Sequence, residues 1–338
     1  MVYLSLSTRI LLDVEALNMT ESVGNFVKHR RAPVVIPTEN GFILRYVPVI
    51  SGESLAHAYQ EILARIALNT GLNVCRLCRR GVFLKHTDKN VFKESGIPRP
   101  SDPKDPELVE EAIVKGCVVE DVGGFLYTDA TLKRTSRFIV GYMIPALDSI
   151  RVSATEAQFH VRYAPTERQQ MIYNIEVGSA LYSLSIALDI DGIGVSSISL
   201  EGGKPRLLVD KIERVKRVEA ALKALHLMIT QQLFGAKRSR FYPHWKIVSL
   251  GVMVSHPLPL NMQPAHSRDY ITDTVNTANE AIKTLRKGSL SVEEKAYLYY
   301  YTEEKISEPK PEYVEVTRLA NPSEVFSKAI DKVLGLMG

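Results

Sequence analysis

The stretch VYLSLSTRILL, residues 2–12, shows the alternation of a β-strand. Apolar residues fill one set of alternate positions, Leu4, Leu6, Ile10 and Leu12, and polar residues fill the other, Ser5, Ser7 and Arg9. Successive side chains of a strand point to opposite faces of its sheet. The stretch therefore predicts a strand with one face in the core and a sheet whose other face is wet.

The next two segments predict a hairpin and a helix. APVVIPTENGFILRYVPVI (32–50) places Asn40-Gly41 between two β-branched runs, which is typical of a tight hairpin turn. SGESLAHAYQEILARIALNTG (51–71) has apolar residues at helical spacing, with Ser51 as the N-cap and Gly71 as the C-cap.

The rest of the chain extends this pattern. Residues 72–130 read as an insertion, and AQFHVRY (157–163) and MIYNIEV (171–177) as a hairpin with the long polar tip APTERQQ. Further expected elements are a helix at 211–233, a strand at 246–255, and helices at 268–286, 291–301 and 322–335. This order predicts an α+β fold of ferredoxin-like type, an antiparallel sheet with helices packed on one face.

Positive charge is clustered although the net charge is only +4, from 42 Lys plus Arg and 38 Asp plus Glu. The clusters are KHRR (28–31), CRLCRR (75–80), LKRTSR (132–137), KIERVKR (211–217) and AKRSR (236–240). A role in nucleic-acid binding must therefore come from local charge rather than a global field. The first residues carry Arg9 and Asp13 where a signal peptide needs an apolar core, so we expect a cytoplasmic protein without a membrane segment.

FGAKRSRF (234–241) is the leading candidate site. Gly235 lets the backbone turn, three cations (Lys237, Arg238 and Arg240) can engage phosphate oxygens, and aromatic residues follow at once. Basic residues interleaved with aromatics are typical of single-stranded nucleic-acid surfaces. The alternative is a basic helix end that complements the macrodipole, which accounts for one charge better than for three.

Two further groups are weaker candidates. KHRR lies after the first strand, and His160 shares a polar strand face with Arg162. Cys75-x2-Cys78 has the spacing of half a zinc site that Cys117 with His57 or His86 could complete, but no second CxxC exists, so ordinary thiols are the preferred interpretation. The chain has no GxxxxGK[ST], HExxH or glycine fingerprint after a strand.

With these residues in view, the sequence resembles the archaeal CRISPR-associated autoregulator (DevR) family, the backbone subunit of type I-A Cascade complexes. The matching stretches are SVGNFVKHRRAPVV (22–35), RYVPVISGESLAHAYQ (45–60), DVGGFLY (121–127), KRTSRFIVGYMIPAL (133–147), AQFHVR (157–162), YNIEVGSALY (173–182), GAKRSRFYP (235–243) and PAHSRDYI (264–271). They run in order along most of the chain. The CRLCRR pair departs from the family pattern.

The resemblance implies a hand-shaped protein. An RRM-like palm would comprise 1–71 and 131–288, with a β-hairpin thumb at about 150–178, a helical finger lobe at 72–130 and a C-terminal helical segment at 289–338. Copies would assemble as a helical filament along one CRISPR RNA, with other Cascade subunits, and meet target DNA through the guide. The resemblance implies no cofactor, metal or catalytic residue. The implied RNA-binding residues are Lys28, Arg30, Arg31, Ser51, His57, Lys133, Arg134, Arg137, His160, Arg162, Lys237, Arg238 and Arg240.

Two other functions stay open from the residues. A metal-independent endoribonuclease acting on CRISPR precursor RNA could use His160 as general acid or base. A transcriptional autoregulator would bind duplex DNA, for which the sequence offers no helix-turn-helix signature.

Overall fold

The structure, a computed structural model, describes residues 2–163 and 170–337. The strands are β1 (Tyr3–Glu15), β2 (Met19–Val23), β3 (Phe26–His29), β4 (Arg31–Thr38), β5 (Gly41–Pro48), β6 (Phe125–Tyr127), β7 (Leu132–Arg134), β8 (Phe138–Val140), β9 (Ile144–Pro145), β10 (Ala154–Tyr163), β11 (Gln170–Asp189), β12 (Val195–Glu201), β13 (Lys204–Leu207), β14 (His244–His256), β15 (Lys295–Thr302) and β16 (Val314–Arg318). The helices are α1 (Gly52–Asn69), α2 (Arg76–Arg79), α3 (Lys89–Ser95), α4 (Pro106–Gly116), α5 (Val118–Gly123), α6 (Lys211–Thr230), α7 (Tyr270–Leu285) and α8 (Pro322–Met337).

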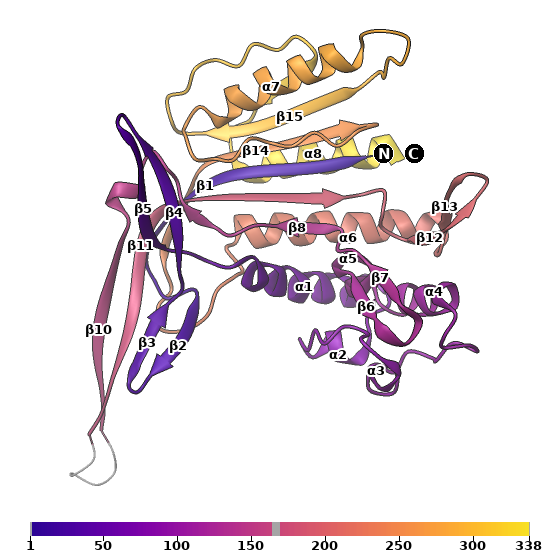
Figure 1. Ribbon diagram of the computed structural model, residues 1–338, viewed down its shortest axis with the longest axis horizontal. Helices are drawn as coiled ribbons and strands as arrows, with labels where there is room; N and C mark the ends of the chain where they lie inside the picture. Colours follow the sequence, from indigo (N-terminus) through magenta and orange to yellow (C-terminus); the bar gives the residue numbers. More distant parts are fainter. Residues whose placement is uncertain (1, 164–169, 338) are drawn as a thin grey trace.

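A mixed sheet with the order β16-β15-β14-β1-β11-β3-β2 forms the centre of the molecule (Figure 1). Strand β1 pairs antiparallel with both β11 and β14, so the stretch quoted first lies in the middle of the sheet. Strands β8, β9 and β10 also pair with β11. The pairs β3–β11 and β15–β16 are parallel, which corrects the prediction of a purely antiparallel sheet.

Helices cover both faces of the sheet rather than one. Helices α1, α6 and α8 share the main core with Leu4, Leu6 and Val252, while α7 packs with Met253 and Leu298 on the opposite side. Since neighbouring residues of β14 fall into different cores, this part of the sheet is buried on both faces. The prediction of helices on a single face is wrong for this edge.

The wet face predicted for β1 is also buried. Ser5 donates a hydrogen bond to the Leu260 carbonyl at 3.0 Å, and Arg9, only 2% exposed, forms ion pairs with Asp148 at 3.0 Å and Glu304 at 2.8 Å. Leu260 lies in the connection between β14 and α7, and Asp148 and Glu304 lie in other segments remote from β1 in the sequence. A local alternation pattern carries no information about such a cover, which is why the prediction failed.

The predicted N-cap of the first long helix is confirmed, whereas its C-cap is Thr70, one residue before the predicted Gly71. The Ser51 hydroxyl accepts from the Ser54 N–H at 3.3 Å, and Gly71 has φ +75 just beyond α1. Residues 295–302 form strand β15 rather than the expected helix, so the segment 289–338 is not purely helical. Residues 297–300 of β15 are buried on both faces, and this continuous apolar run obscures the period of two.

The predicted insertion folds onto α1 as a helical lobe, hereafter the 72–130 lobe, containing α2 to α5 and β6 (Figure 1). Its buried residues belong to the same apolar cluster as the central sheet.

On the other side, β10 and the first half of β11 form a long hairpin that projects from the sheet (Figure 1). Of the predicted polar tip APTERQQ, residues 164–169 lie outside the described residues. Among the described helices, none is long and apolar enough to span a bilayer.

Candidate nucleic-acid interface

The loop after α6 has a defined backbone. Gly235 adopts φ +100, and a Cβ there would stand 2.4 Å from Leu17 Cδ2, so both conformation and space require glycine. The Ala236 N–H donates to the Leu17 carbonyl at 2.9 Å, and the N–H groups of Arg240 and Phe241 donate to the Lys237 carbonyl at 3.1 and 3.2 Å. The loop is therefore anchored on Leu17, just beyond the end of β1, and presents Lys237 and Arg240 to solvent.

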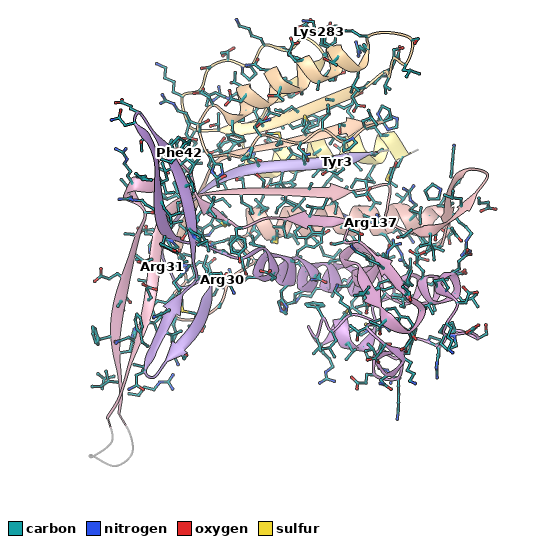
Figure 2. The ribbon with its side chains drawn as sticks, viewed as in Figure 1. Tyr3, Arg30, Arg31, Phe42, Arg137 and Lys283 are labelled. Atoms are coloured by element: carbon teal, nitrogen blue, oxygen red, sulfur yellow. The ribbon has the colours of Figure 1, made fainter. Side chains whose placement is uncertain are left out.

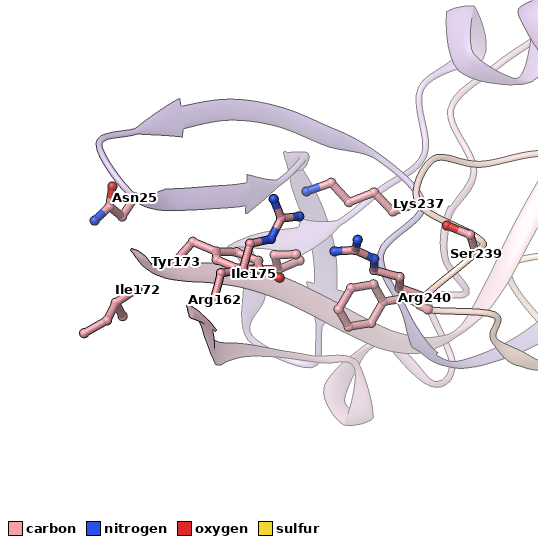
Figure 3. A pocket seen from close by; sticks show the side chains of 9 residues that line it. Asn25, Arg162, Ile172, Tyr173, Ile175, Lys237, Ser239 and Arg240 are labelled. Atoms are coloured by element: carbon pink, nitrogen blue, oxygen red, sulfur yellow. The ribbon is translucent and has the colours of Figure 1, made fainter. Parts of the chain in front are cut away.

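This loop, the β10–β11 hairpin and the β2–β3 turn enclose a pocket of about 620 Å³ (Figure 3), hereafter the basic pocket. It is lined by Asn25, Arg162, Ile172, Tyr173, Ile175, Lys237, Ser239, Arg240 and Phe241. Figure 3 shows Arg162, Lys237 and Arg240 with their charged ends grouped above the Tyr173 side of the hairpin. The structure thus joins Arg162 to the AKRSR loop, more than seventy residues away in sequence.

Aromatic rings form the floor of this pocket. The His160 and Tyr173 rings stack at 5.2 Å between centroids and 19° between planes, and Phe241 meets His160 edge-on at 5.7 Å. The Arg162 guanidinium lies 5.3 Å from the Tyr173 centroid. Tyr173 and Phe241 in turn pack on the small core of Ala16, Ile175 and Val177, which fixes them to the sheet.

The cations of the loop have no acidic partner among the described residues. Lys237 and Arg240 are exposed and form no ion pair there, and Arg238 stacks on Tyr242 at 5.4 Å. Unpaired positive side chains held around a concave surface attract anions, and guanidinium groups suit the oxygens of phosphate. The pocket can therefore bind a polyanion and stack planar rings.

The KHRR residues lie beside the hairpin. Lys28 is exposed on β3 next to β11, with its ammonium 6.0 Å from the Phe26 ring. Arg30 donates to the Tyr142 hydroxyl at 3.3 Å, and Arg31 forms an ion pair with Glu176 at 2.5 Å. Figure 2 shows Arg30 and Arg31 on the same side of the molecule as the hairpin. Of this group, Lys28 is the most available for a ligand.

The LKRTSR residues lie elsewhere, and one of them is buried. Arg134 donates to Glu110 at 2.9 Å, to Asp121 and to the carbonyls of Val195 and Gly192. Since its side chain has no exposed surface, the structure contradicts its predicted contact with RNA. Arg137 pairs with Asp189 at 3.0 Å and lies far from Arg30 and Arg31 in Figure 2, while Lys133 is exposed.

Two other predicted residues are also not in the basic pocket. Ser51 is 3% exposed and caps α1, so its hydroxyl stabilises the helix and does not face a ligand, contrary to the prediction. His57 is exposed on α1 and meets the Phe83 ring edge-on at 4.9 Å.

A buried acid lies at the base of the hairpin. The Tyr182 hydroxyl donates to Glu15 Oε1 at 2.7 Å, and His29 Nε2 lies 3.8 Å from the same oxygen. Burial raises the pKa of Glu15 to about 8 and lowers the pKa of His29. His29 Nδ1 donates to the Arg30 carbonyl at 3.0 Å, which leaves Nε2 as the lone-pair nitrogen facing Glu15. The two groups therefore remain neutral at neutral pH.

Sequence reasoning missed Tyr173, Ile172 and Asn25 as lining residues. The register pairs His160 with Tyr173, so the hairpin pattern contained a signal for Tyr173. The position of Asn25 depends on the parallel pairing of Phe26 with Asn174, which nothing local indicates. Among the described residues, the side chains that could hold a metal ion, Cys75, Cys78, Cys117 and Glu120, lie in the 72–130 lobe and not here.

The fold and the basic pocket define an α+β protein with a basic, aromatic surface beside a projecting hairpin. The sequence profile of the CRISPR-associated negative auto-regulator DevR/Csa2 family matches residues 6–275. The chain belongs to this family.

Individual relatives agree with that assignment. The CRISPR-associated aCascade subunit Cas7/Csa2 2 of Saccharolobus solfataricus is 44% identical over 296 residues, covering 86% of this chain and 90% of the relative. The CRISPR-associated protein Cas7/Csa2 1 of the same organism is 37% identical over 314 residues, covering 90% and 94%. A solved chain from a CRISPR RNA-guided surveillance complex, pre-nicking, has a TM-score of 0.56 at 11% identity, covering 99% of this chain and 100% of that one. At that identity the likeness concerns the fold alone.

Proposed function

We propose that this protein is a non-catalytic, RNA-binding backbone subunit of a type I-A Cascade complex for antiviral defence. The basic pocket is the observation that carries the proposal, because it combines unpaired cations with stacked rings. The name of the 44% identical relative, an aCascade subunit, and the surveillance-complex title of the solved structure support it. Copies in the cytoplasm would line one CRISPR RNA together with other Cascade subunits.

The palm is RRM-like in this proposal. Leaving out the edge strands, the chain runs β1-α1-β8-β11-α6-β14, and the sheet order of these strands is β14-β1-β11-β8. This is the β-α-β-β-α-β connectivity of ferredoxin-like folds. The hairpin β10–β11 would be the thumb and the 72–130 lobe the finger.

The pocket would hold the guide by its backbone. Lys237, Arg240 and Arg162 would contact phosphates, and the Tyr173 ring would support a base or sugar at a kink beside the hairpin. Contacts of this kind do not depend on the RNA sequence, and they leave the pairing edges of the remaining bases free for target DNA. Further RNA contacts beside the pocket would come from Lys28, Arg30, Arg31 and Arg238. On the side of the 72–130 lobe, they would come from Lys133, Arg137 and His57. Arg134 and Ser51 are not included because they are buried.

His160 supports a non-catalytic pocket. Its Nε2 is buried without a hydrogen-bond partner, and its ring lies between Tyr173 and Phe241. A general acid or base must reach the proton it transfers through a hydrogen bond. A ring enclosed in this way suits stacking better than proton transfer.

Exposed apolar side chains support assembly with further copies. On the β4–β5 hairpin Phe42 is 77% exposed and Tyr46 65%, and on β10 Phe159 is 75% exposed. Clustered apolar surface of this kind is typical of interaction sites. In a filament these two hairpins would contact neighbouring copies.

The proposal is tested by titrating the nucleic-acid-free protein with labelled single-stranded CRISPR RNA at several salt concentrations. Replacing Lys237 and Arg240 by alanine should weaken binding to all RNA sequences alike and reduce the slope of log K against log salt by about 1.4, at about 0.7 per phosphate contact. The matched control removes Lys283 and Lys287 at the far edge of the molecule (Figure 2 labels Lys283) and should leave the slope unchanged.

Three results would contradict the proposal. Equal loss in both double variants would show that only net charge matters. Preference for duplex DNA in competition would favour the autoregulator. Cleaved precursor RNA on a denaturing gel, abolished in His160→Ala, would favour the endoribonuclease.

A further inference from the structure

Four potential metal ligands converge in the 72–130 lobe, outside the basic pocket. The Sγ atoms of Cys75, Cys78 and Cys117 and a carboxylate oxygen of Glu120 all lie within 4.8 Å of one another. Each residue is 4% exposed or less. Four donors of this type rarely share one buried site without a function, because each is anionic when deprotonated and burial of several negative charges is unfavourable.

Local structure brings these residues together. Cys75 is the N-cap of α2, and its Sγ accepts the Cys78 N–H at 3.4 Å. Cys117 stands at the junction of α4 and α5, where the Val118 N–H donates to the Asn73 carbonyl at 2.9 Å. That bond draws the start of α5 against the segment preceding Cys75. Glu120 follows on α5, one turn after Cys117.

The separations suit a tetrahedral ion. Zinc–sulfur bonds of about 2.3 Å place the donors of a tetrahedral site about 3.8 Å apart. Cys75 Sγ lies 3.9 Å from Glu120 Oε1, and no two donor atoms in the group are more than 4.8 Å apart, so the donors are within about 1 Å of tetrahedral zinc spacing.

Neighbouring residues orient the carboxylate. The His86 N–H donates to Glu120 Oε2 at 3.0 Å, and His86 Nδ1 lies 2.7 Å from Oε1. His86 Nε2 lies 2.9 Å from Ser95 Oγ on the other side of the ring. Ligand-supporting contacts of this kind are usual around metal centres. His86 is thus held by Glu120 and Ser95, and His57, exposed beside Phe83, is not part of the group.

We propose that Cys75, Cys78, Cys117 and Glu120 bind one structural Zn²⁺ ion that stabilises the 72–130 lobe. Thiolates with one oxygen donor in a closed, four-donor site favour zinc. The ion would join α2 and α5, of four and six residues, which are too short to be stable by themselves. The sequence spacing favoured ordinary thiols. That interpretation changes because the structure adds Glu120 as a fourth donor and holds its carboxylate with the buried His86.

The first test is the metal content of the purified full-length, nucleic-acid-free protein by plasma mass spectrometry. We expect about one zinc per chain, as in closed structural sites, and its loss in Cys75→Ser/Cys78→Ser. Val109→Ala, a buried substitution in α4 of the same lobe, controls for general destabilisation and should retain the zinc. Protein without zinc that takes up none when reduced and given one equivalent of Zn²⁺ would overturn the proposal, as would bound iron or a Cys75–Cys78 disulfide.

The second test identifies the ligands without relying on folding of a cysteine variant. Cobalt(II) exchanged into the wild-type protein should show thiolate charge-transfer absorption. Glu120→Gln should keep that absorption and weaken zinc affinity at least about 10-fold, because losing a direct ligand should cost no less than losing an outer partner of one. Unchanged affinity would remove Glu120 from the ligand set, and absent thiolate absorption would remove the site.

The third test addresses the structural role. Removing zinc with a chelator should accelerate amide hydrogen exchange in the 72–130 lobe and leave β1, β11 and β14 protected. Exchange that is identical with and without the metal would contradict a stabilising role.

Discussion

Two stretches of nearly the same composition, LKRTSR (132–137) and AKRSR (236–240), have opposite structural environments. Arg134 in the first is buried with its guanidinium bonded to Glu110 and Asp121. Asp121 also accepts from Arg217 at 2.8 Å, and Arg217 pairs with Glu213 at 2.6 Å, so two arginines and three acids form one network. Lys237 and Arg240 in the second are exposed on a loop with no acidic partner among the described residues.

The difference teaches that charge clusters cannot be assigned by composition. In β7 the strand alternation turns every second side chain inward, where Arg134 meets acids from α4 and α5. After α6, the left-handed conformation of Gly235 and the anchoring to Leu17 turn the loop outward. The first cluster stabilises the fold, and the second is available to a ligand.

The strongest way to break this comparison is Arg134→Met. It removes the charge while keeping bulk, and it leaves the buried carboxylate of Glu110 without its cation and that of Asp121 with Arg217 alone. We expect a loss of about 3–5 kcal/mol in the free energy of unfolding, the usual cost of breaking a buried pair. Urea unfolding measures it. The matched Arg240→Met should change that free energy by less than about 0.5 kcal/mol; comparable losses in both would show that the two environments do not differ.

Gly235→Ala tests whether the glycine sets the outward loop. Alanine would be strained at φ +100 and would clash with Leu17, so we expect a loss of about 1–3 kcal/mol in unfolding free energy and weaker RNA binding. Gly288→Ala is the control, since Gly288 also has positive φ but open space around it. If both variants lose the same stability and neither loses RNA affinity, the glycine has no special role in shaping the pocket.

The smallest expected effect concerns Glu15, the buried acid at the base of the hairpin, whose neighbour is His29 rather than an arginine. Its folded pKa of about 8 exceeds the unfolded value of 4.5, so the folded state keeps a proton that the unfolded chain releases. This contribution to stability is complete below pH about 4.5 and is lost as the pH rises through 8. His29, whose folded pKa is lowered from 6.5, acts in the opposite direction at acid pH.

Between pH 6.5 and 8 the Glu15 contribution therefore dominates this pair. Urea unfolding of Glu15→Gln across that range should give a flatter stability profile than wild type, because glutamine does not titrate. Glu39→Gln, at the exposed turn of the β4–β5 hairpin, should keep the wild-type slope. A wild-type stability that rises with pH over this interval would show that Glu15 is ionised in the folded protein.

Much of the fold followed from local patterns. The alternation of residues 2–12, the β4–β5 hairpin and the Ser51 cap all describe interactions within a few residues, and each is present, although the turn residues are Glu39 and Asn40 rather than Asn40 and Gly41. The strand at 295–302 and the buried polar face of β1 were mispredicted because their covering segments come from remote parts of the chain. The candidate site divided in the same way, with the AKRSR loop foreseen and Tyr173 and Asn25 missed.

The sequence by itself determined the family, the central strand, the main helices and which segments carry excess positive charge. Tertiary structure alone decided which of those charges are paired in the core and which remain for a ligand, and it brought three cysteines and Glu120 to one point. The physical reason is that periodicity and capping act over a few residues. Ion pairing, burial and metal-ligand geometry depend instead on distances between segments that only the folded chain sets.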